Sequence, residues 1–455
     1  TIEAARHLEA ALELAPVEVK AQLYEALGTV WVGGDQAADA FARAYEVGQE
    51  LGLGPDQALR TLAQRLTVVS RWIGSVSKHP TDEELRDYIQ ELKSLASQAT
   101  EERALVQGLL AQAFLPGSMN DPRPDELAAA VTASQEALAI AERLADPDLQ
   151  SAALDGITVG AMIDDRPTDA LGFIRRRIGI PGLVTSERLD ALIMLSWMQL
   201  LRGDLGESET AAAAVREGLA PGQAPSWVMG ASGWRTEALW TLGRWDEALV
   251  EAARCEQAWR ESQIHAPGFA TNAFLAAFSI SRARRDPVDE EHWRGVAETI
   301  IQRNGPTSRN RRMEAFYRDD LPALHETVVR HHRIFSGRLD YVHRALARLV
   351  DRRHLVEEEV LTELLDYVSV RDLRFLEAHT RRAIGVLHHR PEFLREALMA
   401  FEAMHARPFV ARVKTELGML ERDQAVVDEG LAELERMGDL DQMERAISES
   451  RGTRP

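Results

Sequence analysis

Residues 384–418 read IGVLHHRPEFLREALMAFEAMHARPFVARVKTELG and contain the pattern that decides the fold. Ile384-Gly385 is followed 33 residues later by Leu417-Gly418. Between them, apolar residues recur at spacings of three and four, which places them along one helix face: Leu394, Ala397, Leu398, Phe401 and Met404. A period of this length is typical of chains built from stacked helical hairpins.

The same pattern occurs near the start of the chain, in residues 21–54. Positions 4, 7, 8, 11 and 20 of a 34-residue frame are Tyr24, Leu27, Gly28, Trp31 and Ala40. In the later repeat, positions 7, 8, 20 and 24 are Ile384, Gly385, Ala397 and Phe401. This spacing resembles the tetratricopeptide repeat (TPR), in which small residues at positions 8 and 20 let two antiparallel helices approach closely. A central unit, with Gly243, Trp245 and Ala248 at positions 15, 17 and 20, fits more loosely.

Helix boundaries recur through the rest of the chain. Asp146-Pro147 and Asp286-Pro287 each offer an N-cap followed by proline at the first helical position. Thr81 and Glu84 have the spacing of a capping box. Helical hairpins are therefore expected near residues 55–99, 101–145, 147–178, 185–220, 266–303, 306–335 and 338–369.

These patterns predict an all-α protein, an α-solenoid of about 10–11 TPR-like hairpins in a right-handed superhelix. We expect it to run continuously through residues 1–455, with its best-matching repeats in 380–440. Residues 1–16 match only the second helix of a repeat, because Ala4, Leu8 and Ala11 take positions 20, 24 and 27. A solenoid rarely starts with half a hairpin, so the chain is expected to be a fragment of a longer protein.

Composition excludes several classes of protein. The net charge of −19 argues against broad nucleic-acid binding. The densest apolar stretch, Leu192 to Leu201, contains Ser196 and Gln199, so no membrane span is expected. Cys255 is the only cysteine, which fits a reducing cytoplasm. Four lysines against 49 arginines indicate a GC-rich bacterial source.

The run from Phe401 to Glu435 carries a more specific resemblance. It contains the strings Ala406-Arg407-Pro408-Phe409-Val410-Ala411-Arg412 and Glu416-Leu417-Gly418, and Met437-Gly438-Asp439 follows. These resemble the closing repeats of large bacterial signalling proteins, in which a class III adenylate or guanylate cyclase domain, or a LuxR-type DNA-binding domain, accompanies a STAND-type ATPase and a TPR tail. The resemblance implies a sensor or scaffold role, in which a bound inducer or partner releases the upstream ATPase from inhibition.

Catalytic signals are weak, and no enzymatic activity, metal or cofactor is expected. No Gly-rich loop with Gly-Lys-Ser/Thr is present. Ser75 and Lys78 have the Ser-x-x-Lys spacing of some acylating enzymes, but the companion motifs are missing. The adjacent pairs His331-His332 and His388-His389 point about 100° apart on a helix and seldom share a metal. An enzyme with an unrecognised pocket is the remote alternative, and Cys255 is expected to be inert core.

Two features point to binding. By the TPR frame, groove-facing positions are occupied by Trp240, His379, Arg382, His389, Arg390, Arg412 and Arg422. Arginine at such positions holds carboxylates through charge-assisted hydrogen bonds. Trp240 also belongs to a concentration of tryptophans, for which core packing is the alternative to binding: Trp227, Trp234, Trp240, Trp245 and Trp259. The stretch from Arg303 to Arg353 carries 12 arginines against six acidic residues, either as a binding face or as solvated and internally paired charges.

The sequence thus predicts a non-catalytic, cytoplasmic regulatory module that takes part in protein–protein interaction and signal transduction. Its expected ligand is an acidic peptide or small effector in a concave groove, and its other expected partners are upstream domains of the same protein. Neither nucleic acid nor membrane is expected as a partner. The alternative is a scaffold for self-assembly, or an autoinhibitory surface for an upstream ATPase, with no separate ligand.

Overall fold

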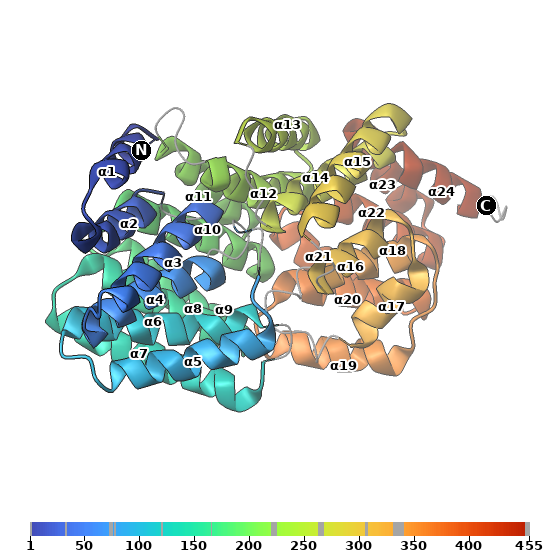
Figure 1. Ribbon diagram of the computed structural model, residues 1–455. Coiled ribbons are helices and arrows are strands. Elements are labelled where there is room, and N and C mark those ends of the chain that lie inside the picture. The colour runs from blue at the N-terminus through green and yellow to red at the C-terminus, as the bar shows by residue number, and fades with distance from the viewer. Residues whose placement is uncertain are drawn as a thin grey trace. The chain divides into compact units, whose positions relative to one another are not determined.

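The structure is a computed structural model that describes residues 2–31, 34–71, 76, 79–119, 122–164, 166–219, 225–262, 268–304, 308–330 and 341–450. Within these ranges every regular element is a helix (Figure 1). The first twelve are α1 (Ile2–Leu14), α2 (Val17–Trp31), α3 (Asp35–Glu50), α4 (Pro55–Arg71), α5 (Asp82–Ala96), α6 (Glu102–Ser118), α7 (Pro124–Arg143), α8 (Pro147–Ile163), α9 (Pro167–Ile178), α10 (Thr185–Arg202), α11 (Leu205–Glu217) and α12 (Pro225–Leu242). The remainder are α13 (Trp245–Ser262), the 3-10 helix η2 (Gly268–Ala270), α14 (Thr271–Ala283), α15 (Pro287–Asn304), α16 (Ser308–Tyr317), α17 (Leu321–Val329), α18 (Val342–Asp351), α19 (Glu358–Ser369), α20 (Arg374–Leu387), α21 (Pro391–Ala403), α22 (Arg407–Glu421), α23 (Gln424–Met437) and α24 (Leu440–Ser450).

Among the described residues, the helices from α2 to α23 follow one another as eleven successive pairs, and the two helices of a pair pack on each other in, for example, α2/α3, α12/α13 and α22/α23, so the predicted all-α solenoid of helical hairpins is confirmed. The expected hairpins at 55–99, 101–145, 147–178 and 185–220 correspond to α4/α5, α6/α7, α8/α9 and α10/α11. Those expected at 266–303, 306–335 and 338–369 correspond to α14/α15, α16/α17 and α18/α19. The limits proposed at residues 220, 266, 306, 335 and 338 lie outside the described residues, and the handedness of the superhelix stays a prediction.

The chain divides into two compact units. Unit 1 comprises residues 1–160, 172–191 and 263–267, and unit 2 comprises residues 161–171, 192–262 and 268–455. Each unit is treated by itself below. The expectation of one continuous array through residues 1–455 stays a prediction.

In unit 1, each helix from α1 to α4 packs on the next, and α6 packs between α4 and α7. The small residues expected at repeat positions 8 and 20 have the expected role. A Cβ atom at Gly28 would lie 2.8 Å from the Phe41 ring, and Ala40 is buried. Gly108 plays the same part for α6, because a Cβ there would lie 2.7 Å from Leu59 Cδ1. Glycine therefore sets how closely these helices approach.

In unit 2, packing between successive helices is joined by contacts between helices far apart in sequence. Helix α12 packs on α22, and α14 packs on α24. Gly203 lies against Met404, and Gly243 lies against Arg407, Pro408 and Met437. The first hairpins of unit 2 therefore contact its last ones.

A single turn geometry joins many of these helices. Eight non-glycine residues adopt the left-handed conformation with φ between 51° and 59°: Ala145, Arg285, Asp319, Arg353, Asp372, His389, His405 and Arg422. In each case the next amide donates to the carbonyl five residues back, as Arg390 N does to Gly385 O at 3.0 Å. This is the Schellman arrangement that caps a helix C-terminus. It ends α20 at Leu387 and α22 at Glu421, so His389, Arg390 and Arg422 lie in turns and not on a helix face.

Candidate functional site

The structure separates the seven residues expected to line a groove. Four of them are buried in unit 2: Trp240, His379, Arg382 and Arg412. His389, Arg390 and Arg422 are exposed at turns. The four buried residues therefore do not face an open groove, because contacts such as that between α12 and α22 enclose this part of unit 2. A binding role for each of them stays a prediction.

Arg382 is 1% exposed and already holds two carboxylates of this chain. Its guanidinium donates to Glu416 Oε2 from Nε at 2.9 Å and to Asp351 Oδ1 from Nη2 at 3.0 Å. Burial opposes the charge, but Glu416 and Asp351 outweigh it and raise the pKa of Arg382. The carboxylates that Arg382 contacts in this structure thus belong to the protein itself.

Arg412 is likewise paired inside unit 2. It donates from Nη2 to Asp439 Oδ2 at 2.8 Å, and Asp439 is fully buried. Asp351 lies 3.7 Å from Arg412 Nη1 and is therefore shared between Arg382 and Arg412. Buried arginines need such paired and hydrogen-bonded partners.

His379 is part of an aromatic core. Its ring centroid lies 4.8 Å from that of Phe375, 5.1 Å from Phe401 and 4.5 Å from Phe409. Burial, followed by the nearby charge of His343, lowers the pKa of His379 well below its ordinary value. A neutral imidazole in this position packs as an aromatic ring, and the binding of an anion by His379 stays a prediction.

The tryptophans of residues 227–259 favour the core alternative. All five are less than a tenth exposed: Trp227, Trp234, Trp240, Trp245 and Trp259. Trp245 donates from Nε1 to the Trp240 carbonyl at 3.1 Å, in keeping with its expected packing position. Trp240 meets the Phe409 ring edge to face at 5.7 Å. Packing therefore accounts for most of the tryptophan concentration.

Trp240 and Arg412 nevertheless line one cavity of about 50 Å³ inside unit 2. They share it with Arg344 and Arg348 of α18, which sequence analysis did not single out. Their only signal was membership in the basic stretch from Arg303 to Arg353. Arg344 lies over the Trp240 ring at 4.6 Å and contacts the Glu237 carboxylate.

A row of arginines occupies the turns of six successive hairpins in unit 2. We name this row the basic edge, and it consists of Arg244, Arg284, Arg318, Arg352, Arg390 and Arg422. Ion pairs tie neighbouring turns together: Arg284 lies 2.8 Å from Asp246, and Arg390 lies 3.1 Å from Glu358. The side chains of Arg318 and Arg390 are 67% and 50% exposed. The basic edge is thus charged, ordered by its neighbours and open to solvent.

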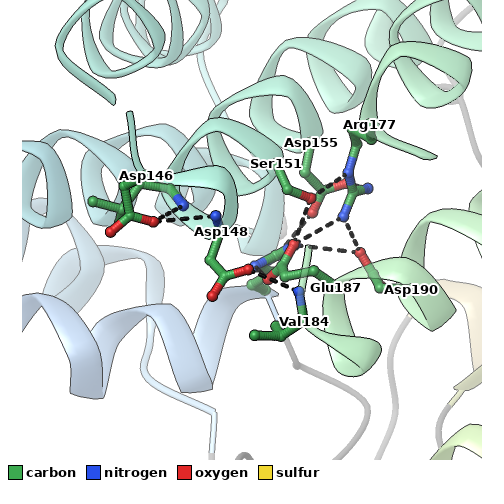
Figure 2. Close-up of polar contacts among 10 residues, drawn as sticks. Asp146, Asp148, Ser151, Asp155, Arg177, Val184, Glu187 and Asp190 are labelled. Atoms are coloured by element: carbon green, nitrogen blue, oxygen red, sulfur yellow. Dashed lines mark hydrogen bonds and ion pairs between the residues drawn. The ribbon is translucent and has the colours of Figure 1, made fainter. Parts of the chain in front are cut away.

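Unit 1 contains a buried ionic network that local sequence patterns did not indicate (Figure 2). Arg71 of α4 and Arg177 of α9 lie among three acids on α8 and α10: Asp155, Glu187 and Asp190. Arg177, fully buried, donates to Asp155 Oδ1 at 2.6 Å and to Asp190 Oδ2 at 2.7 Å. Arg71 donates to Glu187 from both terminal nitrogens, at 2.6 and 2.8 Å.

The network holds one more acid than base, and its acids differ in pKa. Glu187 is buried, but the charges of Arg71 and Arg177 lower its pKa to about 2. Burial and the neighbouring Asp155 charge raise the pKa of Asp190 to about 6. One proton therefore resides on Asp190 in mildly acidic solution, while Glu187 stays ionised.

Signals for catalysis gain no support from the described residues. None of their His, Cys, Asp and Glu side chains form a group of three that could hold a metal ion. Ser75, Lys78, His331 and His332 lie outside the described residues. Cys255 is fully buried, and burial raises the pKa of its thiol well above the ordinary value, as expected for inert core. In the part of the chain that the structure describes, no helix is long and apolar enough to cross a membrane.

Comparisons with known proteins add little to this description. No protein-family model matches the chain, and no curated protein matches it. Among solved structures, one described as a "Circular tandem repeat protein with novel repeat topology and enhanced subunit contact surfaces" is 11% identical and covers 99% of this chain and 96% of its own, with a TM-score of 0.16. A TM-score this low carries no argument, so the helical-repeat architecture rests on the helices and contacts of the chain itself.

Proposed function

We propose that this chain is a non-catalytic protein-interaction scaffold that binds an acidic peptide along the basic edge of unit 2. The observation that supports the proposal is the regular placement of an arginine in the turn of each of six successive hairpins. Of the residues expected from sequence to bind, Arg390 and Arg422 belong to the basic edge, and His389 is exposed in the same turn as Arg390. A partner with carboxylates spaced along an extended segment would meet one guanidinium per hairpin.

Charge and exposure support an acidic partner. The whole chain carries −19, and the arginines of the basic edge are positive charges that lie beside acids of the same turns, such as Asp246, Asp319 and Glu358. Several members already contact a carboxylate of the protein, as Arg352 does with Asp319 at 2.6 Å. Such exposed pairs contribute only about 0–1 kcal/mol, so a peptide carboxylate exchanges with them at little cost. Arginine further favours carboxylates because its planar fork donates two parallel hydrogen bonds.

The binding test compares matched charge reversals. Fluorescence anisotropy of a labelled oligoglutamate peptide is measured with the wild-type chain and with Arg318→Glu/Arg390→Glu/Arg422→Glu. The triple variant should bind at least tenfold more weakly, and wild-type affinity should fall as salt is raised. The control is Arg6→Glu/Arg43→Glu/Arg143→Glu, which makes the same change in net charge on exposed helices of unit 1. If both triple variants lost the same affinity for oligoglutamate, the net charge of the chain would explain the effect, and the proposal would be contradicted.

The signalling context is a further part of the proposal. The strings within residues 401–439 support placing this scaffold in a STAND-type signalling protein with a cyclase or LuxR-type output domain, where peptide or effector binding would be coupled to the ATPase. The ATPase domain from the same gene should hydrolyse nucleotide more slowly when joined to this chain, and oligoglutamate should reverse the inhibition. An encoded protein without such a domain would contradict this part and leave the peptide surface standing.

Self-assembly is the second candidate, favoured by one apolar feature. Leu14 at the end of α1 is 88% exposed and Val17 at the start of α2 is 46% exposed. Burying such side chains against a second copy would gain about 1.5–3 kcal/mol for each large apolar residue. Light scattering should then show association that Leu14→Glu abolishes. A wild-type chain that stays monomeric at high concentration would exclude this candidate.

A further inference from the structure

Four histidines of unit 2 lie beside members of the basic edge, on the three successive hairpins α16/α17, α18/α19 and α20/α21. We name them the edge histidines: His325, His354, His388 and His389. Their neighbours in the basic edge are Arg318, Arg352 and Arg390. His389 is exposed, and the other three side chains are half-buried. Histidine is the residue that changes its charge between about pH 5 and 8, so the proposed peptide surface contains titratable positive charge.

His388 shares an acid with Arg390. Its Nε2 lies 2.8 Å from the Val356 carbonyl oxygen, which can only accept, so Nε2 carries the hydrogen of the neutral ring. The bare Nδ1 lies 3.9 Å from Glu358 Oε2, while Glu358 Oε1 accepts from Arg390 Nη2 at 3.1 Å. A proton added at Nδ1 gives Glu358 a second cation to neutralise. The Arg390 guanidinium is then less compensated and attracts a peptide carboxylate more strongly.

His325 and His354 surround a second acid, Glu357, which is the N-cap of α19. Nε2 of His325 lies 3.0 Å from Glu357 Oε2, and the rings of His325 and His354 lie 5.7 Å apart. Both histidines interact electrostatically with this carboxylate. The Glu357 side chain is 60% exposed, so its charge repels an acidic peptide while the two rings are neutral. Protonated rings cancel that repulsion.

The other charges of these turns keep their sign near neutral pH. Besides Glu357, Glu358 and Arg390, the charged groups are Arg318, Asp319, Asp320, Arg352 and Arg353. Arg352 pairs with Asp319 at 2.6 Å, and Arg318 pairs with Glu314 at 2.7 Å. Arginine and carboxylate side chains ordinarily titrate far from neutral pH. The change in charge of these three turns between pH 6 and 8 therefore comes from the edge histidines, whatever the total charge of the turns.

We propose that the edge histidines make the binding of an acidic peptide stronger as pH falls from about 8 to about 6, a regulation that rests on the proposed function of the basic edge. Lower pH protonates the imidazoles, each proton adds one positive charge, and positive charge attracts the carboxylates of the peptide. The glutamates of the peptide have an ordinary pKa of about 4.3 and stay ionised over this range. The basic edge thus captures an acidic partner in mildly acidic solution and releases it as pH rises.

The test measures anisotropy of the labelled oligoglutamate at pH 6 and pH 8, at one fixed low ionic strength. The wild-type chain should bind roughly three- to tenfold more tightly at pH 6. His325→Gln/His354→Gln/His388→Gln/His389→Asn, the edge variant, should bind with the same affinity at both pH values. The matched control is His7→Gln/His79→Gln/His292→Gln/His405→Asn, which changes four exposed histidines outside these turns. His405 shares the left-handed conformation of His389, and the control should keep the wild-type response to pH.

A second measurement follows the protons directly. Isothermal titration calorimetry at pH 7, in two buffers of different ionisation enthalpy, counts the protons taken up when oligoglutamate binds. The wild-type and control chains should take up protons on binding, because a bound carboxylate favours the charged imidazole. The edge variant should take up none. If the edge variant does not fold by circular dichroism, His388→Gln alone carries the test and should reduce both the response to pH and the proton uptake.

The outcomes separate this regulation from the proposed function. Oligoglutamate binding of equal affinity at both pH values in the wild-type chain would overturn the regulation and leave the peptide surface standing. A full response to pH in the edge variant, or in His388→Gln where that variant replaces it, would do the same. A wild-type chain that binds no oligoglutamate at either pH would contradict the proposed function, and the regulation with it.

Discussion

Arg177 donates to Asp190 at 2.7 Å inside unit 1, yet Asp190 has a raised pKa, of about 6. The attraction of two arginines does not offset burial beside Asp155 and Glu187. An acid with this pKa is protonated on folding in mildly acidic solution and carries an unfavourable charge above pH 6. The network therefore links the stability of unit 1 to pH.

We expect Asp190→Asn to stabilise unit 1 at neutral pH. Ionised Asp190 costs stability above pH 6, and this cost disappears as pH falls through 6 toward the ordinary value of 3.8. The amide imitates the protonated acid, so the variant should be more stable than wild type by roughly 1–3 kcal/mol at pH 7.5 and equal to it near pH 4. Urea unfolding at both pH values measures the difference. If Asp190→Asn were more stable than wild type by the same amount at both pH values, the gain in stability would come from packing and not from ionisation.

Glu187→Gln should have the opposite effect. The pKa of Glu187 is about 2, so its contribution is complete above pH 4.5 and is lost as pH falls toward 2. At pH 7 the variant removes the carboxylate that binds both terminal nitrogens of Arg71. The free energy of unfolding of unit 1 should therefore fall by about 3–5 kcal/mol. The control is Glu142→Gln, because Glu142 pairs with Arg176 with both side chains about half exposed. It should cost at most about 1 kcal/mol.

Local patterns were enough to place the helices. Proline after aspartate marks the starts of α8 and α15, and Thr81 and Glu84 form the expected capping box of α5. Gly28 fits its repeat position because a larger residue would meet the Phe41 ring. These features depend on residues a few positions apart or in the same hairpin, which is why sequence alone reveals them.

The direction of the charged side chains depends on distant residues and could not be predicted. Arg71 and Glu187 are 116 positions apart, so no spacing rule joins them. His389 adopts the left-handed conformation in the turn that follows the end of α20 at Leu387. A non-glycine residue gives no strong sequence signal for such a turn. Arg412 points inward because unit 2 closes on itself, with α12 against α22. The 34-residue repeat frame predicted on which helix each residue lies, but not which distant side chains surround it.

Arg382→Ala should act on stability and not on peptide binding. Removing the guanidinium leaves Glu416 and Asp351 buried, and unit 2 should lose about 3–5 kcal/mol. Arg390→Ala removes an exposed pair with Glu358 and should cost less than about 1 kcal/mol. Chemical denaturation followed by circular dichroism gives both values. Similar costs for the two variants would contradict the buried network around Asp351.

Gly385→Ala should destabilise the hairpin of α20 and α21, because this position has no room for a side chain. An added Cβ would lie 2.5 Å from Leu394 Cγ and 3.0 Å from the Leu394 backbone nitrogen. Leu394 cannot move away without shifting its backbone, so we expect the free energy of unfolding to fall by roughly 1–3 kcal/mol. Gly172→Ala in α9 is the control, since nothing lies within 4 Å of its added Cβ and alanine favours a helix by about 1 kcal/mol. Thermal unfolding should therefore shift in opposite directions for the two substitutions. A stabilised Gly385→Ala would mean that close helix approach at repeat position 8 does not hold the hairpin together.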